Sequence, residues 1–399
     1  MFTPKWKKEA KLLHKGAKKF LNYKRDLLKQ DRIDEIESRR ADLLAAIKAD
    51  DKAKAEEAGK QLRNTCEKAL PMFPAQAWWE EQVEVIWVAL VVALGLRAYV
   101  LQPFRIPTGS MQPTLNGIIV NNHRSDPDYK EPWFGQRWAE GLLRGRSYQN
   151  IVATSEAHMD HVEDRSWFLF TRTAVVMSDK SEIIIPAARN EAAQPFYEGD
   201  RRIQFKAGQP ILRGWIDTGD LVLVDKISYN FRTPKRGEVM VFDTRNLNTD
   251  GDAPGSMNDQ KAADHYIKRL CAVPGDTVQI RNPDVIINGK VASEWQMQRV
   301  ADAKGLYAPP PGATPGYSSV AARYGPHSEG SSFLNSPNKV VTLADKDAAR
   351  GMREYLALGD NTYNSLDSRY WGTVKEYNVV GPGLFALWPI TTGHWGFIK

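Results

Sequence analysis

The 399-residue sequence predicts a mainly β, antiparallel domain preceded by an N-terminal α-helical region and one transmembrane helix. Residues 4–70 are rich in Lys, Ala, Leu, Glu and Arg and contain few helix breakers. An apolar segment follows, and beyond residue 102 short β-type runs alternate with Gly, Pro, Asn and Asp. We therefore divide the chain into a basic helical region at 1–78, a transmembrane helix with its flanks at 79–102, and a β-rich domain at 103–399.

The N-terminal region is predicted to form a helix from residue 4, followed by a second helix over 32–69 that folds back on the first. Residues 1–75 carry 19 basic and 12 acidic side chains, whereas the whole chain has a net charge of +6. A nucleic-acid-binding protein would spread its positive charge over the folded domain, so we expect no nucleic-acid partner. We expect a solvated helix pair, with lipid headgroups or a cytoplasmic protein as alternative partners.

Residues 83–101 are about as long as a membrane-spanning helix needs to be, roughly 17–25 residues. Glu84 and Arg97 lie near its ends, where long side chains can reach the headgroups. About 80 residues precede the segment and no A-x-A site follows, which disfavours a secretory signal peptide. A buried helix of a soluble protein is the alternative. The basic excess predicts that the N-terminal side is cytoplasmic and that residues from about 103 onward are extracytoplasmic, on the inner (plasma) membrane.

Short apolar runs predict the strands of the β-rich domain, at 221–225, 238–242, 277–280, 285–290 and 379–387. Asn288-Gly289 is a hairpin signal, and residues 304–336 are rich enough in Pro, Gly, Ser and Ala to suggest a surface loop. The predicted topology places Cys66 and Cys271 on opposite sides of a membrane, so we expect two free thiols.

Two segments contain candidate catalytic residues. Ser110 lies in a Gly/Pro loop directly after the span, where Gly109 permits the close backbone approach that a nucleophile turn often needs. Lys268 lies in an apolar run, and alternation on a strand turns either Lys268 or Arg269 toward the interior. Burial lowers a lysine pKa from about 10.4 toward the 7–8 that suits a general base. The alternatives are an ordinary turn serine and a solvated lysine on an edge strand.

A third segment, residues 358–372, is dense in small polar residues. Asp367 and Arg369 are two residues apart, so they can pair on one face of an extended chain and orient a catalytic side chain. A hydrogen-bonded loop without a catalytic role is the alternative interpretation.

Together these segments resemble bacterial type I signal peptidases, membrane-bound serine–lysine endopeptidases that cleave N-terminal signal peptides from exported preproteins. The resemblance rests on ordered blocks: Pro-Phe-x-Ile-Pro with Thr-Gly-Ser-Met-x-Pro-Thr-Leu at 103–115, Gly-Asp-Leu-Val-Leu-Val-Asp-Lys at 219–226, Pro-Lys-Arg-Gly-Glu-Val-Met-Val-Phe at 234–242, Tyr-Ile-Lys-Arg at 266–269, Pro-Gly-Asp at 274–276, and Gly-Asp-Asn through Asp-Ser-Arg-Tyr-Trp-Gly at 359–372. It covers about residues 83–116, 217–295 and 355–390.

The resemblance implies a signal-peptidase-like antiparallel β fold and a role for each matching residue. Ser110 would be the nucleophile and Lys268 the general base. The Ser110 N–H and the Thr108 hydroxyl would bind the oxyanion. Ser365 would hydrogen-bond the lysine, and the pair of Asp367 and Arg369 would brace the loop. The family binds its substrate as an added β-strand with shallow pockets for small side chains, and the chemistry uses no metal or cofactor.

One departure from the family pattern is large. About 100 residues, 116–218, separate the serine block from Gly219, where the family has only a few. Tryptophans and the strand-like stretches 166–171 and 183–185 predict that this insert folds, as a lid, a substrate-binding extension or a docking module. His158 and His161 have a spacing that suits a metal on one helical face, but solvated surface histidines are more common, and we expect no metal. Thr362-Tyr363 replaces a charged pair that is usual in the family.

Two rival functions remain open at this point. One is a catalytically silent, membrane-anchored β domain that binds envelope proteins through the insert, although such a scaffold would not need a buried neutral lysine. The other is a dedicated peptidase for a single client, with the insert as its selector.

Overall fold

The computed structural model describes residues 4–69, 78–167, 170–199, 201–247, 265–320, 333–345, 347–349 and 351–399. The chain forms two compact units, Met1–Val92 and Ala93–Lys399. The Pro71 to Pro74 segment before the apolar helix lies outside the described residues.

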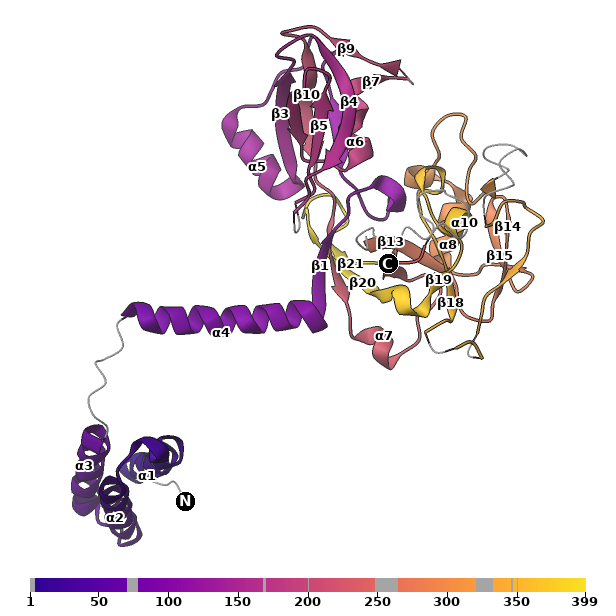
Figure 1. Ribbon diagram of the computed structural model, residues 1–399. Coiled ribbons are helices and arrows are strands. Elements are labelled where there is room, and N and C mark those ends of the chain that lie inside the picture. The colour runs from indigo at the N-terminus through magenta and orange to yellow at the C-terminus, as the bar shows by residue number, and fades with distance from the viewer. Residues whose placement is uncertain are drawn as a thin grey trace. The chain divides into compact units, whose positions relative to one another are not determined.

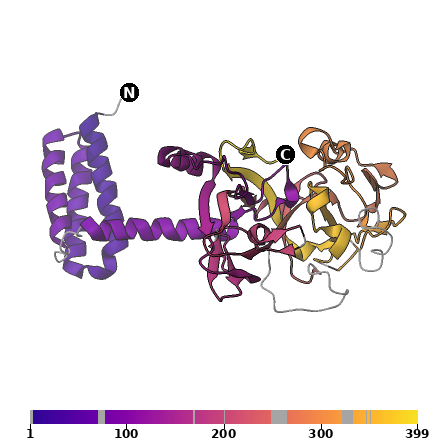
Figure 2. The ribbon, with the colours of Figure 1, turned by 90° about the horizontal axis from the view of Figure 1, so that it is seen from above.

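The N-terminal unit contains three helices that lie side by side in both ribbon views (Figures 1 and 2). They are α1 (Lys5–Lys24), α2 (Gln30–Lys48) and α3 (Lys52–Ala69). The helical prediction is confirmed, but the single second helix over 32–69 is wrong. Asp50 has a left-handed φ of 58°, which ends α2, and the Asp51 carboxylate accepts a hydrogen bond from the Lys54 N–H at the start of α3. Ile36, Leu43 and Leu62 are completely buried, so the three helices share a core.

The apolar segment forms α4 (Trp78–Tyr99). Its residues Gln82–Tyr99 have a mean hydropathy of 1.6, and none of this stretch is buried within the protein. Long, apolar and unpacked, α4 has the properties of a membrane span rather than of a buried core helix.

The described residues of the C-terminal unit include an eight-stranded antiparallel sheet in the order β1-β11-β20-β12-β13-β18-β19, with β21 paired to β20. Its strands are β1 (Leu101–Arg105), β11 (Leu221–Asp225), β12 (Val239–Asp243), β13 (His265–Ala272), β18 (Glu354–Leu358), β19 (Val374–Lys375), β20 (Val379–Trp388) and β21 (Gly396–Phe397). The strands predicted at 221–225, 238–242 and 379–387 are therefore confirmed. The short helical elements beside the sheet include η2 (Gly109–Met111), α7 (Ser228–Phe231) and α10 (Ser368–Trp371).

The insert folds around its own hydrophobic core, which includes Ile118, Val175, Phe196, Phe205 and Ile216. Its described residues form sheets in the orders β2-β10-β3, β6-β5-β4-β9 and β7-β8. The elements are β2 (Ile119–Asn122), α5 (Phe134–Arg144), β3 (Arg146–Val152), β4 (Ala157–Asp164), β5 (Thr173–Met177), β6 (Glu182–Ile185), α6 (Arg189–Ala193), β7 (Tyr197–Glu198), β8 (Arg201–Arg202), β9 (Gln204–Phe205) and β10 (Pro210–Asp217). Of the strand-like stretch 166–171, Trp167 and Phe170 form an isolated bridge, and the two residues between them lie outside the described part.

The two ends of the insert meet at Asp220. The Asp220 carboxylate accepts from the Asn116 N–H at 2.7 Å, and the Asp220 N–H donates to the Asn116 carbonyl at 2.9 Å. The insert therefore leaves and re-enters the main sheet at one point, and its length does not disturb the strands on either side.

A second small sheet packs beside the main one, in the order β16-β15-β14-β17 among the described residues. Its strands are β14 (Thr277–Arg281), β15 (Asp284–Ile287), β16 (Lys290–Val291) and β17 (Val341–Thr342). Between β16 and β17 the chain forms the helical elements α8 (Trp295–Asp302) and η4 (Gly305–Tyr307). Asn288 and Gly289 both have positive φ, as the predicted hairpin requires.

The surface loop predicted at 304–336 is wrong for residues 317–320, which are buried. Tyr317 fills the core of the small sheet, and the Ser318 carbonyl accepts a hydrogen bond from buried Arg369. The small and turn-forming residues of this segment let the chain follow a buried path. The same composition is typical of a solvent-exposed loop, so composition alone does not distinguish the two.

Candidate functional site

Ser110 and Lys268 meet in a buried position although 158 residues separate them. Ser110 lies in η2, immediately after the edge strand β1, and Lys268 lies in the middle of β13. The Lys268 Nζ and Ser110 Oγ atoms are 2.7 Å apart, and the lysine also donates to the Ile267 carbonyl at 3.1 Å. This is hydrogen-bonding distance for proton transfer from a hydroxyl to a neutral amine.

The Lys268 side chain is almost completely removed from water, with 4% of its surface exposed. Burial lowers the pKa of Lys268 to about 8, although the nearby Asp367 carboxylate acts in the opposite direction. A substantial fraction of this amine is therefore neutral near pH 8, whereas an ordinary lysine would be almost fully protonated.

The loop after β18 holds the serine turn in place through its backbone. The Asn361 N–H donates to the Ser110 carbonyl at 3.1 Å, and the Asn361 side chain donates to the Gly109 carbonyl at 3.0 Å. Gly359 lies so close to the turn that an added Cβ would be 2.5 Å from the Ser110 carbonyl oxygen and 2.2 Å from Ser365 Oγ. A glycine is therefore needed at this position for the loop to approach the serine.

The residues expected to bind an oxyanion lie at the entrance of this turn. Thr108 is exposed and has an extended backbone two residues before the serine. Within the described part of the chain, the Thr108 side chain makes no hydrogen bond, and the Ser110 N–H has no backbone acceptor. Both donors are therefore available to a ligand oxygen.

Ser365, Asp367 and Arg369 are all buried behind Lys268. Asp367 and Arg369 form a two-pronged ion pair, with contacts of 2.8 Å to each carboxylate oxygen. Burial by itself would raise the pKa of Asp367, but the Arg369 guanidinium outweighs it and holds this pKa below its ordinary value. Asp367 also accepts from the Gly359 N–H at 3.0 Å, so the ion pair braces the loop that holds the serine turn.

The expected hydrogen bond from Ser365 to Lys268 is not present among the described residues. Ser365 Oγ is buried and has no hydrogen-bond partner there. Thr362, one of the residues that depart from the family pattern, donates its hydroxyl to the Gly316 carbonyl at 2.7 Å, while Tyr363 is partly exposed. The replacement therefore fastens this loop to the buried segment at 316–320.

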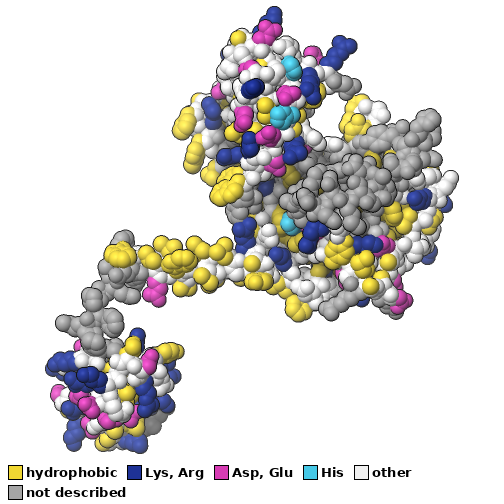
Figure 3. Space-filling model, in the orientation of Figure 1, with side chains coloured by type: hydrophobic (Ala, Val, Ile, Leu, Met, Phe, Trp, Pro, Cys, Tyr) yellow, Lys and Arg dark blue, Asp and Glu magenta, His cyan; other side chains and the backbone are white. Residues whose placement is uncertain are grey.

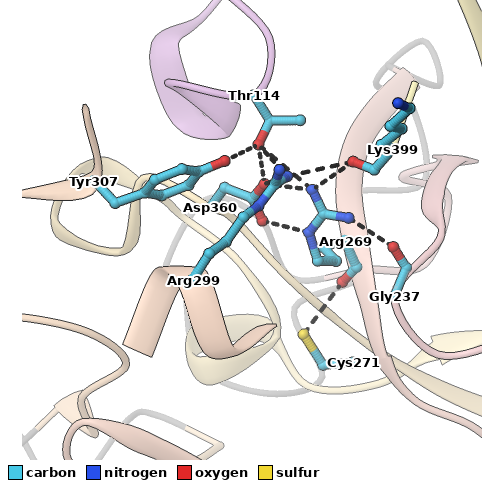
Figure 4. A network of polar contacts seen from close by, with 8 residues as sticks. All are labelled: Thr114, Gly237, Arg269, Cys271, Arg299, Tyr307, Asp360 and Lys399. Carbon is cyan, nitrogen blue, oxygen red and sulfur yellow. Dashed lines mark hydrogen bonds and ion pairs between the residues drawn. The ribbon is translucent and has the colours of Figure 1, made fainter. Parts of the chain in front are cut away.

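A second buried network, which was not predicted from the sequence, lies on the other face of β13 (Figure 4). Arg269 donates to Asp360 through two nitrogens, at 2.7 and 2.5 Å, and neither side chain is exposed. Arg269 also donates to the Gly237 carbonyl at 2.6 Å. Alternation along a strand predicted that only one of Lys268 and Arg269 faces the interior. Both are buried, because protein covers both faces of this strand.

Figure 4 shows Thr114, from the serine loop, joined to this network. The Thr114 hydroxyl contacts the Asp360 carboxylate, lies 2.9 Å from the Tyr307 hydroxyl, and accepts from Arg299 at 2.9 Å. The network therefore connects the serine loop, the lysine strand and the loop after β18. The sequence signal that could have identified it is a charged residue directly beside Lys268 in an apolar strand.

The other candidate groups are separate from this site. Within the described ranges, no cluster of three His, Cys, Asp or Glu side chains is arranged to hold a metal. His158 and His161 lie on strand β4 rather than on a helix, and His161 contacts Asp160 and Glu163. Cys66 and Cys271 are free thiols, and burial raises the pKa of Cys271 to about 12.

Comparisons with known proteins show that the chain is similar to signal peptidases. The family model described as signal peptidase, peptidase S26, matches residues 215–388. A probable signal peptidase I-2 of Synechocystis sp. is 27% identical over 61% of this chain and 83% of its own length. Signal peptidase I of Leptolyngbya laminosa is 30% identical over 44% of this chain and 63% of its own. A solved signal peptidase I from Enterococcus faecalis aligns with 38% of this chain and 97% of its own, at 25% identity and a TM-score of 0.24, which is too low to support an inference.

Proposed function

We propose that this chain is a membrane-bound serine endopeptidase that cleaves signal peptides from exported preproteins, with Ser110 as nucleophile and Lys268 as general base. Its match to the signal peptidase S26 family model over residues 215–388 supports this activity. The observation that carries the assignment of these two residues is the 2.7 Å contact between Ser110 Oγ and a lysine amine that is buried and has a lowered pKa. An exposed lysine at the same distance would be protonated and unable to accept the serine proton.

The reaction follows from the positions of these groups. Neutral Lys268 accepts the Ser110 proton while Ser110 Oγ attacks the carbonyl carbon of the scissile peptide bond. The negative charge that develops on the carbonyl oxygen is stabilised by the Ser110 N–H and the Thr108 hydroxyl. Protonated Lys268 then gives its proton to the leaving amine. Water attacks the resulting ester, again with Lys268 as base, and the signal peptide is released with a free carboxylate.

Three further residues position this pair rather than react. Asp367 and Arg369 brace the loop whose Asn361 holds the Ser110 carbonyl, so a change at either one moves the nucleophile. Ser365 has a buried hydroxyl without a partner among the described residues, and we assign it to hydrogen-bonding the lysine because it matches the family position with that role. No metal or cofactor is required by these steps.

The order of the elements along the chain supports the proposed substrate and location. A signal peptide contains an apolar segment that resides in the membrane, and α4 ends only eleven residues before Ser110. We place the N-terminal helices in the cytoplasm and the β domain on the outer side of the inner (plasma) membrane, because the basic residues precede the span. The substrate chain adds as a β-strand beside the site, and small residues precede the cut.

The decisive experiment is cleavage of a purified preprotein in detergent, with the new N-terminus of the product sequenced. Wild-type protein should cut after a small residue, and Ser110→Ala or Lys268→Ala should lower the rate at least a thousandfold, because a nucleophile and its base act as a unit. Ser166→Ala and Lys290→Ala alter an exposed serine and an exposed lysine far from the site, and both should cut at the wild-type rate.

Failure of wild type to cut, or cutting by both site mutants at the wild-type rate, would favour the silent-scaffold alternative. A comparison of several unrelated preproteins separates a general signal peptidase from an enzyme dedicated to one client. A general enzyme cuts all of them, whereas a dedicated enzyme cuts only one.

A further inference from the structure

Helix α5 of the insert is attached to its sheet by its polar face. Glu140 accepts a hydrogen bond from the Tyr148 hydroxyl on β3 and a charge-assisted bond from Arg146 at 3.3 Å. The Arg137 guanidinium lies over the Tyr148 ring, 5.6 Å from its centre. Surface helices normally turn their apolar face toward the core. In α5 the orientation is reversed, and the contacts of Glu140 and Arg137 hold the helix in that orientation.

The apolar face of α5 consequently points into solvent. Phe134, Trp138 and Leu142 follow one another at four-residue spacing, which places them on one stripe, and they are 82%, 65% and 55% exposed. Trp133 is 74% exposed, and its ring lies across the same helix, only 2.0 Å from where a Cβ at Gly135 would be. Figure 3 shows hydrophobic side chains gathered on the outer side of α5. No described residue of α5 is buried, so this face has no partner within the insert.

The residues around this face match an anionic lipid surface in composition and charge. Trp and Phe are favoured at the boundary between headgroups and acyl chains. Lys130 precedes the helix and Arg144 ends it; both are exposed, and neither forms an ion pair among the described residues. Arg144 also lines a polar pocket of about 280 Å³, together with Thr218, Thr391 and Thr392. Cations beside an aromatic stripe attract anionic headgroups.

The chain also keeps this helix close to a bilayer. One residue separates the end of the apolar helix α4 at Tyr99 from the start of β1 at Leu101, so the domain that contains α5 is tethered at the membrane surface. Such a tether raises the effective concentration of lipid at the helix and lets a weak interfacial contact persist.

We propose that the exposed face of α5, formed by Trp133, Phe134, Trp138 and Leu142, lies in the interfacial region of an anionic lipid bilayer and is a second membrane contact of this protein. The contact would hold the β domain in one orientation on the membrane. This inference depends on the α4 anchor and not on peptidase activity, so it can fail or succeed separately from the proposed function.

The test uses the full chain, with Cys66→Ser and a bimane fluorophore at Leu142→Cys, in nanodiscs that contain one protein and brominated anionic lipid. Cys271 is completely buried and will not be labelled. The matched control carries the label at Gln136→Cys, an exposed position on the polar side of the same helix. Brominated acyl chains should quench the label at 142 several-fold more than the label at 136. Equal, weak quenching at both positions would overturn the proposal.

A double variant, Phe134→Glu with Trp138→Glu, should abolish the quenching at 142. Because both side chains are solvent-exposed, the variant should keep the wild-type Tm, which shows that the loss is not unfolding. Replacement of Lys130 and Arg144 by Gln should reduce the quenching in anionic discs to its value in zwitterionic discs. A different outcome is that the label at 142 becomes shielded from solvent only in discs with two copies of the protein, and that brominated lipid does not quench it. That outcome would assign this face to a second copy and overturn the lipid proposal.

Discussion

Lys268 differs from the other lysines of the chain in its surroundings rather than in its chemistry. Its charged form has lost its water, and its nearest polar neighbours are the Ser110 hydroxyl and the Ile267 carbonyl. Burial therefore favours the neutral amine and lowers its pKa to about 8. Proton transfer from the serine to the neutral amine therefore becomes possible near pH 8.

This pKa sets the pH dependence of the proposed reaction. Only the neutral amine accepts the serine proton, and the pKa is lowered, so kcat/KM should be constant above about pH 8.5 and should fall about tenfold per pH unit below pH 7.5. The measurement is cleavage of a short soluble peptide between pH 5 and 10. An activity that remains flat down to pH 5 would rule out Lys268 as the base.

Gly359 provides a second test at the scale of one residue. A Cβ at this position would overlap Ser365 Oγ and the Ser110 carbonyl, so Gly359→Ala should displace the nucleophile and lower kcat/KM by at least tenfold, with a smaller effect on stability. The control is Gly141→Ala, where the nearest atom to the new Cβ is 3.4 Å away. Equal activity of the two variants would show that the loop tolerates the change.

At the scale of elements, strand β13 places two basic side chains on opposite faces and buries both. Lys268 is stabilised by becoming neutral, whereas Arg269 remains charged and needs a carboxylate. Asp360 supplies it, through two hydrogen bonds between groups with no exposed surface. Because Asp360 also contacts Thr114 of the serine loop, the ion pair holds three elements of the site at one point.

Asp360→Asn should therefore destabilise the domain strongly. Removal of one partner from a buried ion pair leaves an uncompensated charge and costs roughly 3–5 kcal/mol. Urea denaturation of the full chain, followed by tryptophan fluorescence, measures the change in unfolding free energy. Glu163→Gln removes one partner of an exposed pair with Arg165 and should change this free energy by less than about 0.5 kcal/mol. A loss for Asp360→Asn as small as that of the control would contradict the argument.

At the scale of the whole molecule, the protein combines a basic helical unit, an apolar helix and a β domain that holds the candidate site. The N-terminal unit has its own core of Ile36, Leu43 and Leu62, so it does not depend on the β domain for its folding. None of the 82–99 stretch of the apolar helix α4 is buried within the protein, and its length and hydropathy fit a lipid environment.

The proposed orientation can be tested in sealed membrane vesicles. In inverted vesicles the cytoplasmic side faces outward, so trypsin should remove the Lys- and Arg-rich segment 4–69 and leave the β domain intact. In right-side-out vesicles the same segment should be protected. Detergent-permeabilised vesicles are the control and should be cleaved in both preparations. Protection of 4–69 in inverted vesicles would reverse the proposed topology.

Much of the fold was predictable because its signals are local. The breaker-poor N-terminal region, the apolar segment and the strands at 221–225 and 379–387 are all patterns within a short window of sequence. The predictions that were wrong depended on what lies elsewhere in space. The break at Asp50 depends on how three helices pack, and the burial of 317–320 depends on Arg369 and the small sheet.

The order of residues along the chain shows which groups are available for chemistry: a serine in a glycine- and proline-rich turn, a lysine in an apolar strand, and an Asp–Arg pair two residues apart. Tertiary packing is what places Ser110 2.7 Å from Lys268, buries Arg269 against Asp360, and turns the apolar face of α5 to solvent. The physical reason is that desolvation depends on atoms brought from distant parts of the chain. The same lysine has an ordinary pKa in water and a pKa of about 8 in this fold.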